Sequence, residues 1–567
     1  MLFKPKVLFG QILLQNNIIN EEQLNTALAK QKETGDLLGV TLMKMGFVDE
    51  EAIMLPLLAE QLDVDFISLK EKAIKPDIIR RVPAKFATYY KVLPLSYQDE
   101  ALTIATPHPL DINIIDGIGL VTQGKIHTIL ASEKDIMEGI RKYYGVGAET
   151  IDKMMDSVDV EDALDQTVDN IEEIDSDASI GKFINQILLQ AYKDRATDIH
   201  IEPYENDLKI RYRVDGILYD TQLPTNIWHF RDAINSRIKI MSNLNIAEKR
   251  LPQDGRFKVK VGVVDLDLRV SFLPTPYGES VVIRILSSTK LYNMRELGLA
   301  GEKQNILNEL IKKPHGIIFV TGPTGSGKTT TLYSCLSNIN NTDRKIITIE
   351  DPIEYQLAGT TQVQINPGIG LTFAAGLRSM LRHDPDIMMV GEVRDLETAE
   401  IAVQVALTGH LVLSTLHTND AASGITRLID MGVEPYLITS SVECFIAQRL
   451  VRLICPKCKK KMKVSVQVAQ ELRLDSKEIS EGFTLFEGEG CDYCNFTGFY
   501  GREGIYEFLK VDEAIKEMIM NKASVSKIKS KAIESGMQPL IRDGWNKVRQ
   551  GLTTPSEVIR VTKEETN

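Results

Sequence analysis

One glycine-rich segment carries a lysine and a threonine at a fixed spacing. The pattern G-x-x-x-x-G-K-[ST] is met in full by Gly322-Pro323-Thr324-Gly325-Ser326-Gly327-Lys328-Thr329, with Thr330 next. An apolar run that ends at Val320 precedes the segment, which predicts a loop between a strand and a helix. Successive N–H groups of such a loop point at an anion, Lys328 reaches the β- and γ-phosphates, and Thr329 binds Mg²⁺. We therefore predict a nucleoside triphosphate site, rather than a Gly-rich turn with an exposed lysine.

Acidic and imidazole side chains follow other apolar runs of the same region. They are Glu350 after residues 346–349, Glu392 after 387–390 and the intervening Gly391, and His417 after 411–413. The carboxyl ends of parallel strands meet at one edge of a sheet, so these groups are expected beside the triphosphate. One carboxylate can hold the Mg²⁺ shell while another orients the attacking water. Each acid taken singly could instead be a helix cap or a turn residue.

Four cysteines form two C-x-x-C pairs. The pairs are Cys455 with Cys458 and Cys491 with Cys494, and 32 residues separate them. Each pair can offer two thiolates, so together they make the tetrahedral Cys₄ shell of a structural zinc site. A redox motif is the alternative for a single pair. Two pairs in one region favour zinc, and a closed shell leaves no open position for catalysis.

The size and composition of the chain limit what surrounds these motifs. The chain has 567 residues, is 43% hydrophobic and carries a net charge of −12. This length predicts about three or four domains. Without a signal-peptide pattern or an apolar run of about 18 residues, and with six cysteines, we expect a cytoplasmic protein. The acidic total also argues against nucleic acid as the main partner.

Most of that negative charge lies in one segment. Residues 149–177 hold twelve acidic residues and one lysine, a net charge of −11, so the rest of the chain sums to about −1. Like charges repel and little apolar area can be buried there. We predict a flexible linker over residues 146–178, with a solvated acidic helix face as the alternative.

The region before the linker, residues 1–145, contains a weak internal repeat. Its members are Gly10, Leu13, Ile19, Leu24 and Leu28, which recur 29 residues later as Gly39, Leu42, Val48, Ile53 and Leu57. Asn20 and Asp49 stand where helix caps belong, so two amphipathic helices are predicted. Residues 62–145 are expected to be mixed α/β, with strands near 93–95 and 102–105.

The region after the linker has two styles of sequence. Residues 179–296 suggest a helix at 180–195 and strands at 198–202, 209–214 and 264–270, the last alternating apolar and polar as in a half-exposed antiparallel sheet. From residue 303 to 567, short continuous apolar runs alternate with helical segments. Such runs are buried on both faces of a parallel sheet in an α/β domain.

These motifs resemble those of the type II secretion and type IV pilus assembly ATPases, over nearly the whole chain. Residues 349–355 resemble the family's aspartate box, and 384–395 its atypical Walker B motif, in which Gly391 replaces the usual Asp. Residues 408–420 resemble its histidine box. The resemblance implies that Glu350 polarises the attacking water and that Glu392 binds Mg²⁺. It also implies that the histidine-box residues His410 and His417 sense the γ-phosphate.

The resemblance also implies a multidomain α/β fold. It comprises a helical and α/β N-terminal domain, a PAS-like α+β second N-terminal domain, and a RecA-like P-loop ATPase domain with a Cys₄ zinc lobe at about 450–500. The family is hexameric, and arginines of the second domain complete each nucleotide site. Arg269 and Arg284 match those positions, although strand-surface arginines often form salt bridges instead.

The implied function is that of a cytoplasmic homohexamer that hydrolyses ATP, with Mg²⁺ and Zn²⁺, to extend type IV pili. An inner-membrane platform protein and a cytoplasmic scaffold protein would recruit it to the inner face of the inner membrane, as a peripheral protein. Pseudopilus assembly in type II secretion is the alternative. Pilus retraction is less expected, because retraction ATPases typically lack the Cys₄ lobe. A nucleic-acid translocase is also less expected, because the sequence has no Lys/Arg cluster with interleaved aromatics. The nearest candidate, residues 458–463, is expected to be a solvated face of the zinc lobe.

The N-terminal domain has a further possible ligand. In some family members it binds cyclic di-GMP through an Arg two residues before each motif glycine, and Leu8 and Leu37 stand there in this chain. The sequence therefore favours a docking and regulatory domain over a cyclic di-GMP site.

Overall fold

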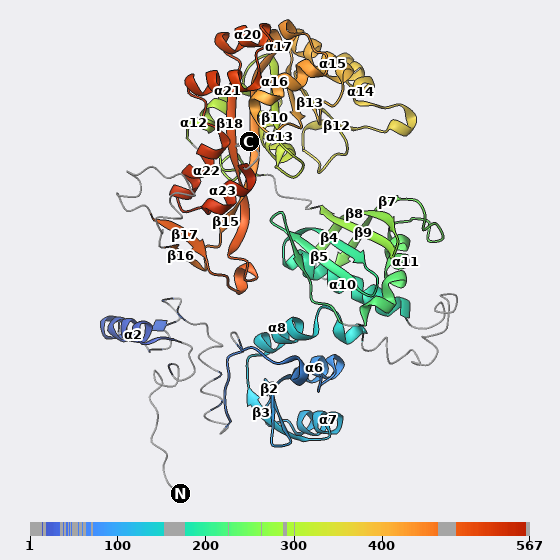
Figure 1. Cartoon of the computed structure of the whole chain (residues 1–567), viewed down its shortest axis with the longest axis vertical. Coiled ribbons are helices and arrows are strands. Elements are labelled where there is room, and N and C mark those ends of the chain that lie inside the picture. Colours follow the sequence, from blue (N-terminus) through green and yellow to red (C-terminus); the bar gives the residue numbers. More distant parts are fainter. Residues whose placement is uncertain are drawn as a thin grey trace. The chain divides into compact units, whose positions relative to one another are not determined.

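A computed structural model shows how these segments fold. It describes residues 72–151, 176–224, 226–261, 264–286, 292–299, 301–462 and 484–562, with helix α2 and scattered positions between 14 and 69. The chain divides into two compact units, Met1–Ile285 and Leu286–Asn567, which are described separately (Figure 1). Among the described residues, no helix has both the length and the apolar character needed to cross a membrane.

The first unit begins with part of the predicted repeat. Helix α2 spans Glu21–Thr34 and follows Asn20. The backbone N–H of Gln23 donates to Asn20 Oδ1 at 2.8 Å, and the N–H of Asn20 donates to Gln23 Oε1 at 3.0 Å. This reciprocal capping confirms the predicted start of the first helix. The matching helix after Asp49 falls outside the described residues.

Residues 72–144 form a small α/β layer. The strands are β1 (Leu93–Gln98), β2 (Ala101–Thr106) and β3 (Lys125–Leu130), and the helices are α5 (Pro76–Ile79), α6 (Ala84–Tyr90), α7 (Ile112–Thr122) and α8 (Glu133–Tyr144). The sheet order is β1-β2-β3, antiparallel in the first pair and parallel in the second. Leu102 and Ile104 are buried in its core, which confirms both predicted strands.

A second sheet follows within the same unit. The elements are α10 (Ser176–Lys193), β4 (Ala196–Pro203), β5 (Leu208–Val214), β6 (Ile217–Asp220), η2 (Ile227–Phe230), α11 (Arg231–Met241), β7 (Gln253–Val261), β8 (Val264–Thr275) and β9 (Gly278–Leu286). The strand order is β6-β5-β4-β9-β8-β7. Apolar side chains of the sheet pack against α10 and α11, whereas alternate residues present a polar face. The predicted half-exposed antiparallel sheet is confirmed.

The ends of the predicted linker belong to this second sheet's domain. Ala148 and Ile151 are buried, and the N–H of Val146 donates to the carbonyl of Gln222 at 3.0 Å. Helix α10 already begins at Ser176. The expectation of a linker over 146–178 is therefore too wide at both ends, because apolar side chains next to the acidic run are buried. Residues 152–175 lie outside the described part.

The second unit is a sheet between two helical layers. Its strand order is β12-β11-β13-β14-β10-β15-β18, and all neighbours are parallel except β15 and β18. The first half comprises α12 (Glu302–Leu310), β10 (Gly316–Thr321), α13 (Lys328–Ile339), β11 (Ile346–Glu350), β12 (Thr360–Gln364), η3 (Pro367–Ile369), α14 (Phe373–Met380), η4 (Leu381–His383), β13 (Ile387–Val390), α15 (Leu396–Leu407) and β14 (Leu411–Leu416). The four predicted strands are all present and fully buried, which confirms the parallel sheet.

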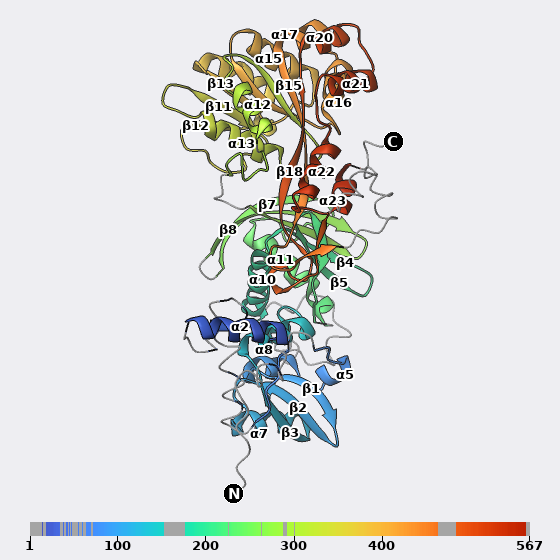
Figure 2. The same cartoon turned by 90° about the vertical axis from the view of Figure 1, so that its left-hand side faces the viewer.

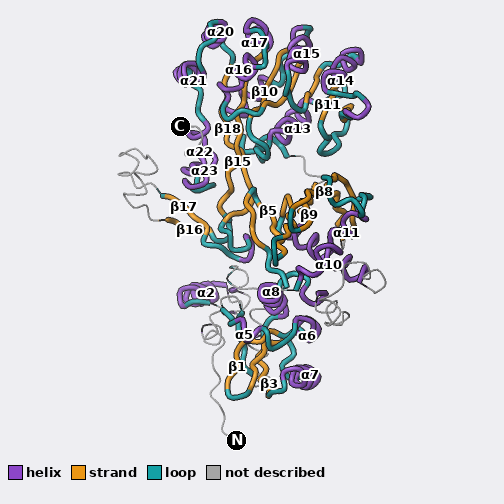
Figure 3. Tube along the Cα trace, turned by 45° about the vertical axis from the view of Figure 1, so that its right-hand side comes forward, coloured by secondary structure: helices purple, strands orange, loops and turns teal. Residues whose placement is uncertain are grey.

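The rest of the second unit extends this sheet and covers it. It comprises α16 (Ala421–Asp430), α17 (Pro435–Ser441), β15 (Val442–Ile454), β16 (Lys459–Met462), β17 (Leu485–Gly488), η5 (Asp492–Cys494), β18 (Phe499–Lys510), α20 (Glu513–Met520), α21 (Val525–Glu534), α22 (Leu540–Arg549) and α23 (Pro555–Thr562). The two long strands β15 and β18 run side by side (Figure 2). Helices flank the sheet in the tube view (Figure 3), and separate apolar clusters fill its two sides.

Candidate active site and metal centre

The predicted phosphate-binding loop lies between β10 and α13. Gly327 adopts a left-handed conformation with φ of 87°, and helix α13 begins at the next residue, Lys328. A Cβ on Gly322 would lie 2.5 Å from Ser326 Oγ and 2.6 Å from the carbonyl oxygen of Gln448. Glycine is therefore required at both places. The loop presents the first turn of α13, where Thr329 and Thr330 are half-buried, to any ligand above it.

The lysine of this loop is folded back over its own backbone. Lys328 Nζ donates to the carbonyl oxygens of Gly322 at 2.8 Å and Pro323 at 3.1 Å. The pKa of Lys328 is lowered to about 8, chiefly by burial; Glu392 opposes the shift and Arg449 contributes to it. These carbonyl contacts hold the ammonium where an anion would replace them. The hydroxyls of Thr321 and Ser326 are buried and have no hydrogen-bond partner within the described residues, which suits a loop that binds a polar ligand.

Glu392 and His417 meet at the same edge of the sheet. In the strand register, Ile349, Val390 and Ser414 lie side by side, so the residues after them emerge together. Glu392 is 9% exposed, and its Oε2 lies 3.2 Å from His417 Nε2. Its other oxygen, Oε1, lies 2.5 Å from Nη2 of Arg394. A carboxylate held in this way beside Lys328 suits a water-mediated magnesium site.

The surroundings of Glu350 conflict with the role expected for it. Its side chain is only 2% exposed, and both carboxylate oxygens accept hydrogen bonds from the protein. Tyr333 Oη donates to Oε2, while Thr348 Oγ1 at 2.5 Å and Gln362 Nε2 at 3.2 Å donate to Oε1. Three of the roughly four acceptor positions of the carboxylate are therefore filled by buried donors. The role of Glu350 in polarising the attacking water stays a prediction, which these contacts do not favour.

The sequence reasoning overlooked a second acid of the same box. Glu354 lies in the loop after β11, four residues beyond Glu350, and it is exposed. Its backbone N–H donates to Tyr333 Oη at 3.3 Å, which fixes the backbone of this loop. The signal was present, because residues 349–355 contain both acids. Burial of one and exposure of the other distinguishes their roles.

His410 does not lie at the nucleotide edge. It precedes β14, whereas His417 follows that strand. Leu411 pairs with Gly316 at the start of β10, and Leu416 pairs with Thr321 beside the phosphate-binding loop. Six strand residues therefore separate the two histidines by about 20 Å. For this reason, the expectation that His410 contacts a nucleotide bound at the phosphate-binding loop of the same chain is corrected.

Arg269 and Arg284 lie in β8 and β9 of the first unit. Arg284 Nε donates to Asp198 Oδ1 at 2.8 Å, and its side chain is 57% exposed. Arg269 is half-buried and faces Arg256 across the β7–β8 pair. Both alternate with residues of the apolar core, so both lie on the polar face of the sheet. The site built within residues 286–567 contains neither arginine, and their role as arginine fingers stays a prediction.

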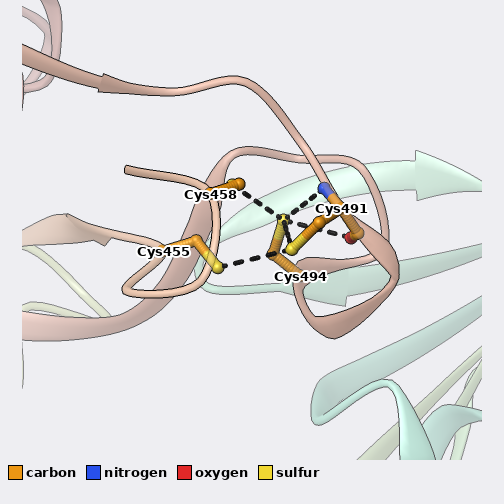
Figure 4. A group of neighbouring side chains, drawn as sticks. All are labelled: Cys455, Cys458, Cys491 and Cys494. Carbon is orange, nitrogen blue, oxygen red and sulfur yellow. Dashed lines mark hydrogen bonds between the residues drawn. The ribbon is translucent and has the colours of Figure 1, made fainter. Parts of the chain in front are cut away.

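The four cysteines of the C-x-x-C pairs converge (Figure 4). All their sulfur atoms lie within 4.8 Å of one another, with Sγ–Sγ distances of 3.8 Å for Cys455 and Cys491, 3.9 Å for Cys458 and Cys494, and 3.8 Å for Cys491 and Cys494. A tetrahedron of sulfurs about 2.3 Å from zinc has edges of about 3.8 Å. Backbone N–H groups donate to two of the sulfurs, at 3.3 Å from Gly490 and 3.2 Å from Cys491. The donor set and its shape fit zinc.

The chain was compared with known proteins. Residues 173–560 match the family model described as Type II/IV secretion system protein, and residues 62–150 match the MshEN domain. The chain is 44% identical over 559 residues to a type IV pilus assembly ATPase, PilB, of Myxococcus xanthus, covering 97% of this chain and 98% of that protein. It is 39% identical over 559 residues to a type II secretion system protein E of Xanthomonas campestris, covering 98% of each.

A solved structure supports the fold alone. The ATPase DotB of Legionella pneumophila superposes with a TM-score of 0.50 at 23% identity, covering 68% of this chain and 96% of that one. The phosphate-binding loop, the acidic strand ends and the match over most of the chain agree with one another. The chain therefore belongs to the type II/IV secretion system protein family, as an ATP-hydrolysing member.

Proposed function

We propose that the second unit hydrolyses ATP at the edge formed by the ends of β10, β11 and β13. The observation that carries this is the juxtaposition of Lys328, Glu392 and His417 beside the phosphate-binding loop. Lys328 exchanges its carbonyl contacts for the β- and γ-phosphates. Thr329 and Glu392 hold Mg²⁺, which neutralises charge on the phosphates when bound. His417, hydrogen-bonded to Glu392, senses the γ-phosphate.

Glu354 polarises the attacking water in this proposal. It is exposed in the loop after β11, whereas Glu350 is enclosed by three donors. A general base must lie within reach of water, and the side chain of Glu354 is exposed whereas that of Glu350 is buried. Arg269 and Arg284 of a neighbouring copy complete the charge neutralisation, in a homohexamer whose nucleotides lie between subunits.

The work done by hydrolysis is the assembly of a filament. The full-length similarity to a type IV pilus assembly ATPase supports pilus extension, and the similarity to type II secretion proteins E supports pseudopilus assembly as the second candidate. The protein would act in the cytoplasm, at the inner face of the inner membrane, through a platform protein and a scaffold protein. The N-terminal residues 1–145 serve as the docking domain; cyclic di-GMP is not part of the proposal, because residues 8 and 37 are leucines.

The zinc lobe has a structural role in this proposal. Cys455, Cys458, Cys491 and Cys494 hold one Zn²⁺ in a closed shell. The shell joins the end of β15 to the start of β18, since Cys455 directly follows Ile454 and Cys494 lies five residues before Phe499. The metal thereby closes the far end of the two-stranded ribbon that borders the phosphate-binding loop.

A complementation experiment tests the filament assignment. A strain lacking the gene is supplied with the wild-type chain, with Lys328→Ala or with Glu354→Gln, and both surface pili and secreted proteins are scored. Pilus extension predicts that only the wild-type chain restores pili and that secretion never changes. Restored secretion with unchanged pili would assign the chain to type II secretion instead.

A further inference from the structure

A buried tyrosine joins the phosphate-binding helix to the loop that carries Glu354. Tyr333 lies in α13, five residues after Lys328 and so about 7.5 Å further along the helix axis. It is 0% exposed. Its hydroxyl donates to Glu350 Oε2 and accepts the backbone N–H of Glu354 at 3.3 Å. One oxygen atom therefore contacts both the carboxylate of Glu350 and the backbone of Glu354.

The partner carboxylate is itself anchored from two strands. Thr348 of β11 and Gln362 of β12 both donate to Glu350 Oε1. Gln362 also donates to the carbonyl of Tyr355 at 3.2 Å and accepts the N–H of Leu357 at 2.8 Å. The loop after β11 is thus tied at three points to one buried network. Networks whose members are all satisfied are rigid and hold a single arrangement.

We propose that Tyr333 is a positioning residue that fixes the Glu354 loop to the phosphate-binding helix, with Glu350 as its anchor. The inference rests on the proposed role of Glu354. Because α13 begins at Lys328 and Thr329, phosphates that set the position of this helix also set the position of the loop through Tyr333. In this proposal Glu350 anchors Tyr333 and does not itself activate water.

The chemistry of the hydroxyl supports positioning rather than proton transfer. Burial raises the pKa of Tyr333 above its ordinary value, and the hydrogen bond to Glu350 raises it further. The hydroxyl therefore keeps its proton at neutral pH and remains a donor to Glu350. It is enclosed by Glu350, Glu354 and Gln362, so the tyrosine does not touch the reacting atoms.

The neighbouring tyrosine offers a matched control. The rings of Tyr333 and Tyr355 pack edge to face with centroids 4.6 Å apart. The hydroxyl of Tyr355 is buried but has no hydrogen-bond partner within the described residues. Tyr355→Phe therefore removes an equivalent oxygen from the same ring pair without breaking the network.

The test is a double-mutant cycle on the full-length chain, measured by steady-state ATP turnover and by ADP affinity. We expect Tyr333→Phe to lower kcat by about tenfold, with KM and ADP affinity within about twofold of the wild type and Tyr355→Phe unchanged. In a Glu354→Gln chain, Tyr333→Phe should change the residual rate less than about twofold. Gln362→Ala, which loosens the loop and leaves every residue of α13 in place, should behave in the same way and serves if Tyr333→Phe does not fold.

Two results overturn the inference. One is wild-type kcat in folded Tyr333→Phe and Gln362→Ala chains; the other is an undiminished tenfold loss when Tyr333→Phe is added to Glu354→Gln. Either result, with Glu354→Gln inactive, leaves the proposed hydrolysis intact and removes only the positioning role. Wild-type turnover in Glu354→Gln would instead remove the role of Glu354, and the inference with it.

Discussion

The cysteine site allows a prediction whose size follows from the structure. The recorded Sγ–Sγ distances of 3.8–3.9 Å match the edge of a zinc-centred tetrahedron, about 3.8 Å, so binding needs little rearrangement. Structural zinc sites of this kind contribute on the order of 10 kcal/mol to folding. In its described part, the lobe between Ile454 and Phe499 holds only the two-stranded sheet β16–β17 and the short helix η5, and such a sheet is marginally stable alone. Cys494→Ser should therefore unfold the lobe.

The assay combines zinc content with hydrogen exchange. The wild-type chain should carry one zinc per subunit and protect the amides of 455–462 and 485–498. Cys494→Ser should carry almost none and lose that protection, while the large apolar clusters of the second unit keep theirs. Cys335→Ala is the control, because Cys335 is buried in α13 outside the four-cysteine cluster. One zinc per subunit in Cys494→Ser, or unchanged protection after its loss, would refute the reasoning.

Three further predictions concern buried charges. Glu350→Ala leaves three buried donors unpaired and should lower the free energy of unfolding, measured by urea titration, by about 3 kcal/mol. Glu354→Ala should change the free energy of unfolding by less than about 0.5 kcal/mol. Equal losses of stability in the two variants would contradict this prediction. Burial lowers the pKa of Lys328 to about 8, so ADP binding at higher pH must also protonate this lysine. The Kd for ADP should therefore rise about tenfold per pH unit above pH 8, and Lys328→Arg should lose this pH dependence. A Kd for the wild type that does not change above pH 8 would contradict the prediction. Burial would raise the pKa of Glu557, but hydrogen bonds from two arginines lower it to about 2. The resulting contribution to the free energy of unfolding, about 3 kcal/mol, is present above pH 4.5, is lost as the pH falls towards 2, and should be missing in Glu557→Gln. Acid unfolding curves that are the same for the wild type and Glu557→Gln would contradict this.

Much of the fold could be predicted from the sequence because its signals are local. The strands of the second unit are continuous apolar runs buried on both faces, and the loop before Lys328 has glycine where left-handed backbone is needed. The cysteine pairs likewise carry their spacing in the sequence, and the structure brings all four sulfurs together. In each case the residue types and their spacing form a pattern that can be read directly from the sequence.

The surroundings of the two glutamates in residues 349–355 could not be predicted, because they depend on contacts with residues outside that motif. Whether Glu350 or Glu354 faces solvent depends on Tyr333, 17 residues before Glu350, and on Gln362, 12 residues after it. No local pattern shows those contacts. The placement of His410 was different, because a strand from 411 to 416 already puts the residues before and after it at opposite edges of a sheet. The role of a motif residue therefore has to be checked against the direction of its strand.

Steady-state Mg²⁺-ATP turnover by the full-length chain tests the proposed nucleotide site and its water-polarising group. We predict that Lys328→Ala abolishes turnover, that Glu354→Gln lowers kcat by about a hundredfold or more, and that Glu350→Gln, which keeps an acceptor oxygen in the buried network, loses less than Glu354→Gln. Wild-type turnover in Lys328→Ala would contradict the nucleotide site itself. An inactive but folded Glu350→Gln beside a fully active Glu354→Gln would contradict the assignment of the water-polarising group.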